Sequence, residues 1–410
     1  MNLLRDQSLI NYNTFGVDVK AKFFAEVFSE EELFQLIIDK KFKDAKKYFL
    51  GGGSNILFTK DFDGIIIKVS ISGIKICEEN SDSALIEAGA GIIWNDLVKF
   101  SVDKNFGGIE NLTLIPGTIG AAPIQNIGAY GQEIADTFES LSGIFVETGK
   151  RKTFNKNECN FSYRSSIFKN ELKNKFVITS IQLKLSKNPK PNTSYKILRE
   201  YLSEQKISRS TIKEISNAVA TIRRKRLPDP SKIGNVGSFF KNPVVSEREY
   251  SKLKSEFPKI LSFPSQGDSV KLSAGWLIEK CGWKGKRIGE VGTSPDHALI
   301  ICNFGKASGV EILEFAMSQA RRPHAAPADT DPRRDDRGED RARRVAVGLQ
   351  RGPRAVGKRD VESGSERARR HARRWGADHR DREPPPAERA SPWRGPPRPL
   401  RRDPRRGGER

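Results

Sequence analysis

The pattern of apolar and polar residues at the start of the chain predicts a strand, then a helix, then a strand. Residues 20–27 (KAKFFAEV) alternate as a strand does, and residues 29–42 (SEEELFQLIIDKKF) have helical spacing with Ser29 at the N-cap. Residues 46–58 place three glycines between two apolar runs, which predicts strand, turn and strand. Residues 63–70 (DGIIIKVS) are apolar enough for a buried strand.

The next part of the chain mixes strands with a helix and a long irregular segment. Residues 84–106 predict a strand that turns into a helix near Trp94, and residues 140–148 and 175–186 predict further strands. Residues 111–138 are rich in glycine, alanine and proline, as in a loop whose backbone approaches a ligand closely. This mixture predicts an α+β fold.

A stretch with several prolines and asparagines, residues 187–195, marks a domain boundary. Beyond it the pattern predicts helices at 211–227, about 247–257, 273–283 and 307–322, and a strand at 297–303. We therefore divide the chain into residues 1–70, 71–205, 206–322 and 323–410.

Residues 323–410 differ in composition from everything before them. They contain no isoleucine, asparagine, phenylalanine, tyrosine or cysteine, and Lys358 is their single lysine. Such a segment cannot bury enough apolar area to offset the entropy lost on ordering. We therefore expect a disordered, arginine- and proline-rich tail that is not native to the fold.

Charge and residue usage narrow the classes of function. The formal net charge of +21 divides into +10 on the tail and +11 on the body, which suits anionic small molecules and would also suit nucleic acid. The four cysteines form no C-x-x-C pair, so we expect no metal site and no redox motif.

No apolar run resembles a secretion signal or a membrane span, so we expect a cytoplasmic protein, and we expect a monomer. His297 is the only histidine before the tail, which disfavours Ser-His-Asp and Cys-His chemistry.

The first candidate ligand motif is Gly51-Gly52-Gly53-Ser54-Asn55. Backbone N–H groups of three glycines can converge on an anion, and the serine and asparagine add side-chain donors, which is a way to hold a diphosphate without a lysine. The alternative is a plain glycine turn between strands. The motif is not the βαβ dinucleotide fingerprint, because a strand rather than a helix follows it.

The second candidate motif is the loop from Pro116 to Gly131. Its many small residues suggest backbone packed against a flat ligand, and its isoleucines make it too apolar for a flexible linker, which is the alternative. Its candidate ligand contacts are Pro116, Gly117, Gln125, Asn126, Gly128, Ala129 and Tyr130.

Five sequence blocks together resemble one known family. They are LGGGSNILF, IPGTIGAAPIQNIGAYG, ECNFSYRSSIF, RKRLPDP and GSFFKNPVVS. In their order and spacing they are similar to the UDP-N-acetylenolpyruvoylglucosamine reductases, in the longer variant with a tyrosine loop. The resemblance runs from about residue 11 to about residue 320.

The resemblance implies an FAD-binding fold of the vanillyl-alcohol-oxidase type. Residues 1–70 and 71–205 would be its two FAD-binding subdomains and residues 206–322 a separate α+β substrate domain. It also implies that NADPH reduces the flavin in this UDP-N-acetylmuramate dehydrogenase reaction. The enolpyruvyl ether of UDP-N-acetylglucosamine then accepts a hydride from the flavin and a proton from the protein, giving UDP-N-acetylmuramate for peptidoglycan precursor synthesis.

Two catalytic residues follow from the resemblance. Arg164 matches the family's arginine, and a cation beside the substrate carboxylate stabilises the enolate charge as it develops. Ser238 matches the proton donor, and its weakly acidic hydroxyl must be positioned on the carbon to serve. Taken alone, without the resemblance, Arg164 would be an ordinary solvated surface charge, and the alternative for Ser238 is an ordinary turn serine.

The resemblance also supplies ligand contacts. Tyr195 would close over the UDP group, Arg226 would meet the diphosphate, and Lys241 and Asn242 would contact the substrate. Arg223 would support the flavin or the nucleotide, although a helix-surface charge is the alternative. Both glycine-rich motifs would contact FAD.

The chain departs from the family at its C-terminal end. The family ends with a strand whose glutamate is the third catalytic residue, and none of the tail glutamates lies in an apolar strand context. These are Glu339, Glu362, Glu366, Glu383, Glu388 and Glu409. We assign no residue to this role and expect FAD binding with impaired turnover.

Two other functions remain open. Another FAD-dependent oxidoreductase of the same fold would share the glycine-rich loops but not the set Arg164, Ser238 and Tyr195. A nucleic-acid binder would use the tail, but its interspersed acids and near lack of aromatic residues argue against a specific site.

Overall fold

The computed structural model describes residues 2–207, 210–265, 267–320 and 354–356, which all belong to one compact unit, Met1–Gly357. The predicted disorder of the tail therefore lies outside the described residues, apart from β20 (Arg354–Val356). The backbone of β20 pairs as a parallel strand with β4 (Ile56–Phe58).

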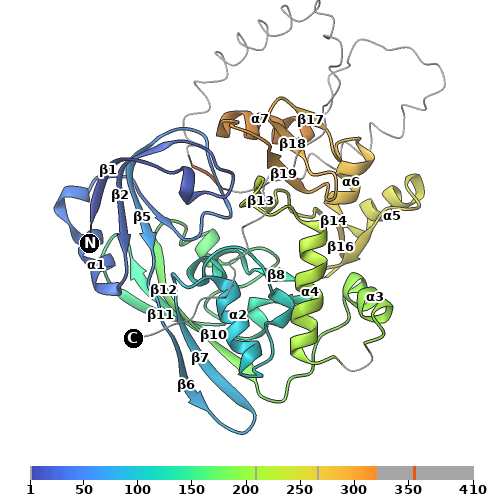
Figure 1. Cartoon of the computed structure of the whole chain (residues 1–410), viewed down its shortest axis with the longest axis horizontal. Coiled ribbons are helices and arrows are strands. Elements are labelled where there is room, and N and C mark those ends of the chain that lie inside the picture. The colour runs from blue at the N-terminus through green and yellow to red at the C-terminus, as the bar shows by residue number, and fades with distance from the viewer. Residues whose placement is uncertain (1, 208–209, 266, 321–353, 357–410) are drawn as a thin grey trace, which may run out of the picture. The chain divides into compact units, whose positions relative to one another are not determined.

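The first part of the chain forms a four-stranded sheet and one helix, drawn in blue in Figure 1. In spatial order the strands are β1 (Leu3–Ser8), β2 (Lys20–Val27), β5 (Phe62–Val69) and β3 (Lys47–Leu50). Helix α1 (Glu30–Ile38) begins as predicted, with the Ser29 side chain accepting a hydrogen bond from Glu32 N at 3.1 Å. It ends earlier than predicted, because Asp39 takes an extended conformation and caps a separate 3₁₀ turn.

The second part is built on a five-stranded antiparallel sheet. In spatial order its strands are β11 (Arg151–Asn155), β10 (Phe138–Phe145), β12 (Phe176–Ser186), β7 (Ser83–Gly89) and β6 (Ile74–Glu79). Helix α2 (Trp94–Asp103) begins at Trp94 as predicted, and this buried indole donates to Leu112 O at 3.0 Å. The buried side chains of β12 include Ile181, Leu183 and Leu185, which fill the core under the sheet.

The irregular segment predicted at 111–138 contains no long element among its described residues. It consists of 3₁₀ turns at Glu110–Leu112, Ile119–Ala121, Pro123–Gln125 and Ile134–Asp136, and of the short hairpin β8 (Gly128–Ala129) and β9 (Gln132–Glu133). Its backbone is therefore held by local turns, by the two-stranded β8–β9 pairing and by bonds to the strand-to-helix turn before α2, such as Ile119 N to Ile92 O at 2.9 Å.

The last part combines helices with two small sheets. Its helices are α3 (Lys196–Glu204), α4 (Ile212–Arg226), α5 (Glu247–Glu256), α6 (Ala274–Lys280) and α7 (Gly309–Ala320). One sheet has the order β13 (Gly234–Ser238), β19 (Ile300–Asn303), β18 (Val291–Thr293) and β17 (Arg287–Ile288); the other has β14 (Val244–Ser246), β16 (Ser269–Leu272) and β15 (Ser262–Pro264). The sequence pattern did not predict α3 or most of these strands. Strands of two to five residues are stabilised by pairing with distant partners, and a local sequence pattern does not reveal that pairing.

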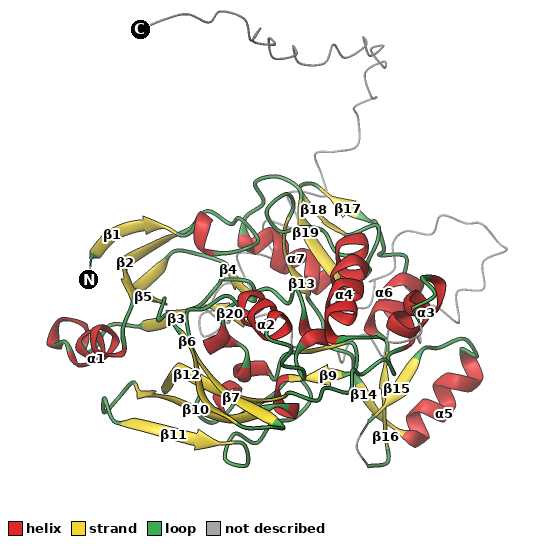
Figure 2. Ribbon diagram, turned by 60° about the horizontal axis from the view of Figure 1, so that its bottom comes forward, coloured by secondary structure: helices red, strands yellow, loops and turns green. Residues whose placement is uncertain are grey.

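One hydrophobic core joins the first and last parts of the chain. It includes Phe15 and Phe24 from the first part with Phe239, Ile278 and Phe315 from the last. Figures 1 and 2 show α7 and the β13–β19 sheet beside this region. The two parts are thus fixed to one another by buried apolar area.

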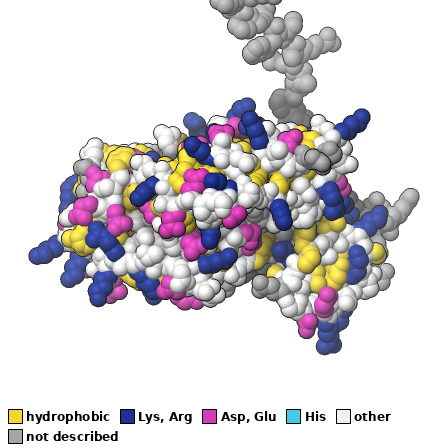
Figure 3. All heavy atoms as spheres, turned by 90° about the horizontal axis from the view of Figure 1, so that it is seen from below, with side chains coloured by type: hydrophobic (Ala, Val, Ile, Leu, Met, Phe, Trp, Pro, Cys, Tyr) yellow, Lys and Arg dark blue, Asp and Glu magenta, His cyan; other side chains and the backbone are white. Residues whose placement is uncertain are grey.

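Charges are mixed over the face seen in Figure 3, where basic and acidic side chains alternate without a continuous basic stripe. Within the described part of the chain, no helix combines the length and the apolar character that crossing a membrane requires.

Candidate active site

The structure brings the two glycine-rich motifs into contact. The motif Gly51–Asn55 connects β3 and β4, and a Cβ atom on Gly52 would lie 3.1 Å from the Cα of Gly117 in the second motif. The side-chain amide of Asn55 donates to Gln125 Oε1 at 2.9 Å. The motifs therefore form one continuous surface.

Glycine is required at two positions of this surface. Gly53 has a φ of +65°, and a Cβ there would collide with the carbonyl oxygen of Tyr12. Gly117 has a φ of +119°, and a Cβ there would approach Ser54 Oγ to 3.0 Å. Both backbone conformations are ones that L side chains rarely adopt.

This surface fits a diphosphate group. Among the described residues, none accepts a hydrogen bond from the backbone N–H groups of Gly51, Gly52 or Ser54. Unpaired N–H groups in a glycine-rich loop form a concave anion site. Pro116, at the start of the second motif, is exposed.

Arg164 lies in a tight hairpin, Ser162–Ser165, closed by two backbone hydrogen bonds between its ends. The arginine has a φ of +54°, a strained conformation for a side chain of this size. Its Nη1 donates to Asn126 O at 3.1 Å and its Nη2 donates to Gly128 O. A Cβ on Gly128 would lie 2.8 Å from Nη1, so glycine leaves room for the guanidinium.

Asn126 and Glu133 complete the support of this arginine. Asn126 is buried, with a φ of +44°, and its amide donates to Glu133 Oε2 at 2.6 Å and to Ser162 O at 3.2 Å. The other carboxylate oxygen of Glu133 lies 3.7 Å from Arg164 Nη1. In this structure the side chain of Asn126 thus orients the hairpin of Arg164.

Tyr163, the neighbour of Arg164, connects this hairpin to the last part of the chain. The Lys271 ammonium lies 4.1 Å from the centre of its ring and the Arg164 guanidinium 5.3 Å from it. Burial raises the pKa of the Tyr163 hydroxyl, whereas Arg164 and hydrogen bonds from Asn242 act in the opposite direction. The Asn242 side chain also accepts from Ala274 N at 3.0 Å.

A second cluster gathers the predicted nucleotide contacts. The rings of Tyr130 and Tyr195 meet edge to face, with 5.4 Å between centroids. Burial lowers the pKa of Arg223, and its Nε has no partner among the described residues. Burial and the charge of Arg226 lower the pKa of His297 to about 4. The cluster is therefore cationic and aromatic, with an unpaired buried donor that fits an anionic ligand.

The remaining predicted residues lie on the last part of the chain or on the β8 turn. Ser238 is exposed at the end of β13, and Lys241 follows in the loop before β14, partly buried. Gly237 precedes Ser238 with a φ of +69° and open space around it. Ala129 pairs with Gln132 in the β8–β9 hairpin.

The structure adds residues that sequence reasoning did not propose for the site, namely Glu133, Tyr163, Lys271 and His297. Tyr163 could have been found, since it lies beside Arg164 in an apolar segment, and His297 stood out as a lone histidine. Glu133 and Lys271 carried no signal, because charged residues in polar surroundings are ordinarily solvated.

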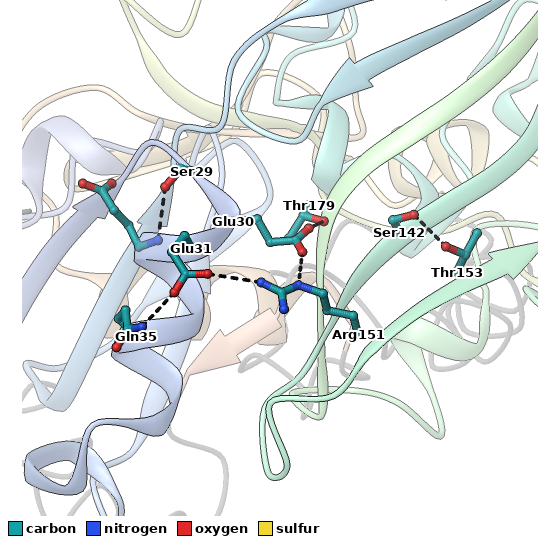
Figure 4. A network of polar contacts seen from close by, with 9 residues as sticks. Ser29, Glu30, Glu31, Gln35, Ser142, Arg151, Thr153 and Thr179 are labelled. Carbon is teal, nitrogen blue, oxygen red and sulfur yellow. Dashed lines mark hydrogen bonds and ion pairs between the residues drawn. The ribbon is translucent and has the colours of Figure 1, made fainter.

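Two hollows elsewhere show no comparable arrangement. They lie beside α1 and the five-stranded sheet, and both include Glu30 in their walls. Arg151 Nε lies 2.5 Å from Glu30 Oε1 and its Nη2 lies 3.3 Å from Glu31 Oε2, while the Thr179 hydroxyl donates to Glu30 Oε2 at 2.7 Å. Figure 4 shows Arg151 and Thr179 pointing toward Glu30. These charges pair with one another, so the network attaches α1 to the sheet. No group of three or more His, Cys, Asp or Glu suited to a metal occurs in the part of the chain that the structure describes.

Comparison with known proteins agrees with this geometry. The family model of the FAD binding domain matches residues 21–155, and that of the UDP-N-acetylenolpyruvoylglucosamine reductase, C-terminal domain, matches residues 229–322. The first match identifies FAD as the cofactor and confirms the predicted FAD-binding fold. The tail from residue 323 lies outside both matches.

The chain is similar to named relatives over most of their length. It is 48% identical to the UDP-N-acetylenolpyruvoylglucosamine reductase of Flavobacterium johnsoniae over 317 residues, which is 77% of this chain and 94% of the relative. It is 43% identical to the enzyme of the same name from Amoebophilus asiaticus over 318 residues, covering 78% and 94%. The crystal structure of the Thermus caldophilus UDP-N-acetylenolpyruvylglucosamine reductase shares the fold, with a TM-score of 0.55, 24% identity, and coverage of 78% of this chain and 93% of that one. The predicted family is thereby confirmed, and the chain belongs to the UDP-N-acetylenolpyruvoylglucosamine reductases.

Proposed function

We propose that this chain is an NADPH-dependent flavoenzyme that reduces UDP-N-acetylglucosamine enolpyruvate to UDP-N-acetylmuramate in peptidoglycan precursor synthesis. One observation carries the proposal beyond family membership. The hairpin of Arg164 is held by the carbonyls of Asn126 and Gly128 on one side and meets Asn242 and Lys271 through Tyr163 on the other. The cofactor region and the substrate region therefore meet at the arginine.

The two glycine-rich motifs would hold FAD, with the N–H groups of Gly51, Gly52 and Ser54 directed to its diphosphate. When bound, FAD supplies the hydride. The protein must then bind the substrate carboxylate and provide a proton. Arg164 would stabilise the negative charge that develops on the enolate, and Ser238 would donate the proton to the adjacent carbon.

The cationic cluster would bind the UDP group. Tyr195 would cover it, and Arg226 would contact the diphosphate. Arg223 would serve the flavin or the nucleotide through its unpaired Nε. Lys241 and Asn242 would contact the substrate near the loop that bears Ser238.

We further propose the domain limits 1–70 and 71–205 for the two FAD-binding subdomains and 206–322 for the substrate domain. The sheets support this division, since the first two lie within residues 1–205 and the two small ones within residues 206–322. A monomer acting in the cytoplasm, without a nucleic-acid partner, is the simplest setting for a small nucleotide-sugar substrate.

The proposed reaction is tested in the absence of oxygen, which would itself reoxidise the flavin. The FAD-loaded protein is reduced with one equivalent of NADPH and mixed with the enolpyruvyl nucleotide, and flavin absorbance near 450 nm is followed. Reoxidation with formation of UDP-N-acetylmuramate supports the proposal. Reduction by NADPH without reoxidation by this substrate would instead favour another FAD-dependent oxidoreductase. A rate below that of the Flavobacterium johnsoniae relative is expected, because no described residue takes the role of the family's C-terminal glutamate.

A further inference from the structure

Lys271 is a charged residue of the last part of the chain that lies in the neighbourhood of Arg164. It occupies the central strand of the β14–β16–β15 sheet, where it pairs with Val244 on one side and Phe263 on the other. Figures 1 and 2 show this sheet close to the β8–β9 hairpin. Its ammonium group lies 4.1 Å from the centre of the Tyr163 ring, and the side chain is half-buried.

This ammonium group has hydrogen-bonding capacity to spare. No oxygen among the described residues accepts a hydrogen bond from it, although an ammonium carries three donors. Burial lowers the pKa of Lys271, Glu133 opposes that shift, and Arg164 adds to it. The lysine therefore interacts with two charges, Arg164 of the Ser162–Ser165 hairpin and Glu133 of the β8–β9 hairpin.

The local charge is unbalanced. Arg164 and Lys271 bring two positive charges to the faces of one tyrosine, and Glu133, 3.7 Å from Arg164, supplies one negative charge. The terminal nitrogens of Arg164 already donate to Asn126 O and Gly128 O, which fixes the guanidinium. Two of the five N–H groups of Arg164 are used in this way, and the ammonium of Lys271 adds its own donors beside those that remain, so one more negative charge would complete the cluster.

We propose that Lys271 binds the carboxylate of the enolpyruvyl substrate beside Arg164. This inference rests on the proposed function and extends it, because it assigns the carboxylate a second cation from the substrate domain. The carboxylate would occupy the unfilled anionic position, with Lys271 donating a charge-assisted hydrogen bond. Since the enolate is conjugated with that carboxylate, the same lysine lowers the free energy of the developing charge.

The competing explanation is that Lys271 only clamps the two regions through Tyr163. The two roles differ in what they do to substrate binding. A clamp contributes to the midpoint of thermal unfolding and is served by any side chain that covers the ring. A carboxylate ligand contributes to substrate affinity and needs a positive charge.

The experiment compares the FAD-loaded wild type with Lys271→Met and Lys271→Arg. Lys254→Met is the matched control, because Lys254 is exposed on α5, which packs near the same sheet. Substrate dissociation constants are measured from the flavin difference spectrum of the oxidised protein, and kcat and KM from NADPH oxidation. Flavin reduction by NADPH alone is timed separately.

We expect Lys271→Met to weaken substrate binding on the order of 10- to 100-fold and to lower kcat as well, since a hydrogen bond to a charged group is lost. Lys271→Arg should recover most of the affinity, and the control should match the wild type. Flavin reduction by NADPH should change little in any variant.

Unchanged substrate affinity in Lys271→Met, with or without a lower unfolding midpoint, overturns the inference. A defect confined to reduction by NADPH overturns it too. If the wild type itself is not reoxidised by the enolpyruvyl substrate, the proposed function fails first and the inference falls with it.

Discussion

The side-chain amide of Asn55 donates a hydrogen bond to the side-chain oxygen of Gln125, at 2.9 Å and across 70 residues of sequence. This contact joins the two glycine-rich motifs that the sequence could only propose separately. It is exposed, so it contributes to orientation of the loops more than to the stability of the core.

Replacement of Asn55 by alanine should therefore loosen the FAD site while leaving the fold intact. We expect the dissociation constant for FAD to rise by about 3- to 10-fold, as for the loss of one ordinary hydrogen bond. Quenching of flavin fluorescence on titration into the apoprotein measures it. Asn157→Ala, at an exposed asparagine on the turn that follows β11, should bind FAD like the wild type. Equal affinity of Asn55→Ala and Asn157→Ala would show that the contact does not serve the cofactor.

Gly53 and Gly16 offer a matched test of the glycine requirement. Their φ angles are +65° and +66°, but a Cβ on Gly53 would strike the Tyr12 carbonyl, whereas one on Gly16 would meet nothing within 4 Å. Gly16→Ala should cost about 1–2 kcal/mol, for the left-handed conformation alone. Gly53→Ala should cost at least about 1 kcal/mol more, because backbone must move to relieve the collision. Urea unfolding of both variants gives the difference, and equal losses would contradict the predicted collision.

Replacement of Arg164 by methionine should lower kcat by about 10²- to 10³-fold, the usual loss when one group that stabilises developing charge is removed. FAD content should stay close to that of the wild type, since the glycine motifs remain. Steady-state kinetics and the absorbance ratio of the purified protein give both quantities. Arg248→Met, at an exposed arginine on α5, is the control. A variant that keeps its kcat would rule out the catalytic role.

Ser238→Ala should lower kcat by about 10²- to 10⁴-fold, the range associated with a positioned proton donor. Flavin reduction by NADPH should be unaffected, because the Ser238 hydroxyl acts only in the second half-reaction, after the flavin has transferred a hydride to the substrate. Rapid-mixing measurement of the two half-reactions separates these effects. Ser255→Ala, on the exposed face of α5, should behave as the wild type. A loss shared equally by both half-reactions would point to a misfolded loop.

His297 predicts a dependence of stability on pH. Its pKa is lowered from 6.5 to about 4, by burial first and then by the charge of Arg226. Between these values the unfolded chain binds more protons than the folded one, so stability is full above pH 6.5 and falls as the pH decreases toward 4. The loss at this residue amounts to at most about 3 kcal/mol. In urea unfolding at pH 7 and pH 5, His297→Gln should show a smaller difference than the wild type. An identical difference would mean that other groups cause the acid sensitivity.

The sequence by itself determined the local elements and the identity of the chemistry. The strand at residues 20–27, the Ser29 cap and the helix start at Trp94 were all predicted, because each depends on side-chain periodicity and capping within a few residues. The FAD-binding fold and the family were also predicted, since five blocks in a fixed order are specific where one glycine motif is not.

Only the tertiary structure decided which charges share a site. Glu133, Arg164 and Lys271 come from a short hairpin, a tight turn and a separate sheet, and no local pattern relates them. Burial and the long-range pairing of short strands place them around Tyr163, where a low dielectric makes their charges matter to one another. The local periodicity of a segment carries no information about such distances. The hydrogen bonds that a hairpin or turn makes within itself are the same wherever the other segments lie.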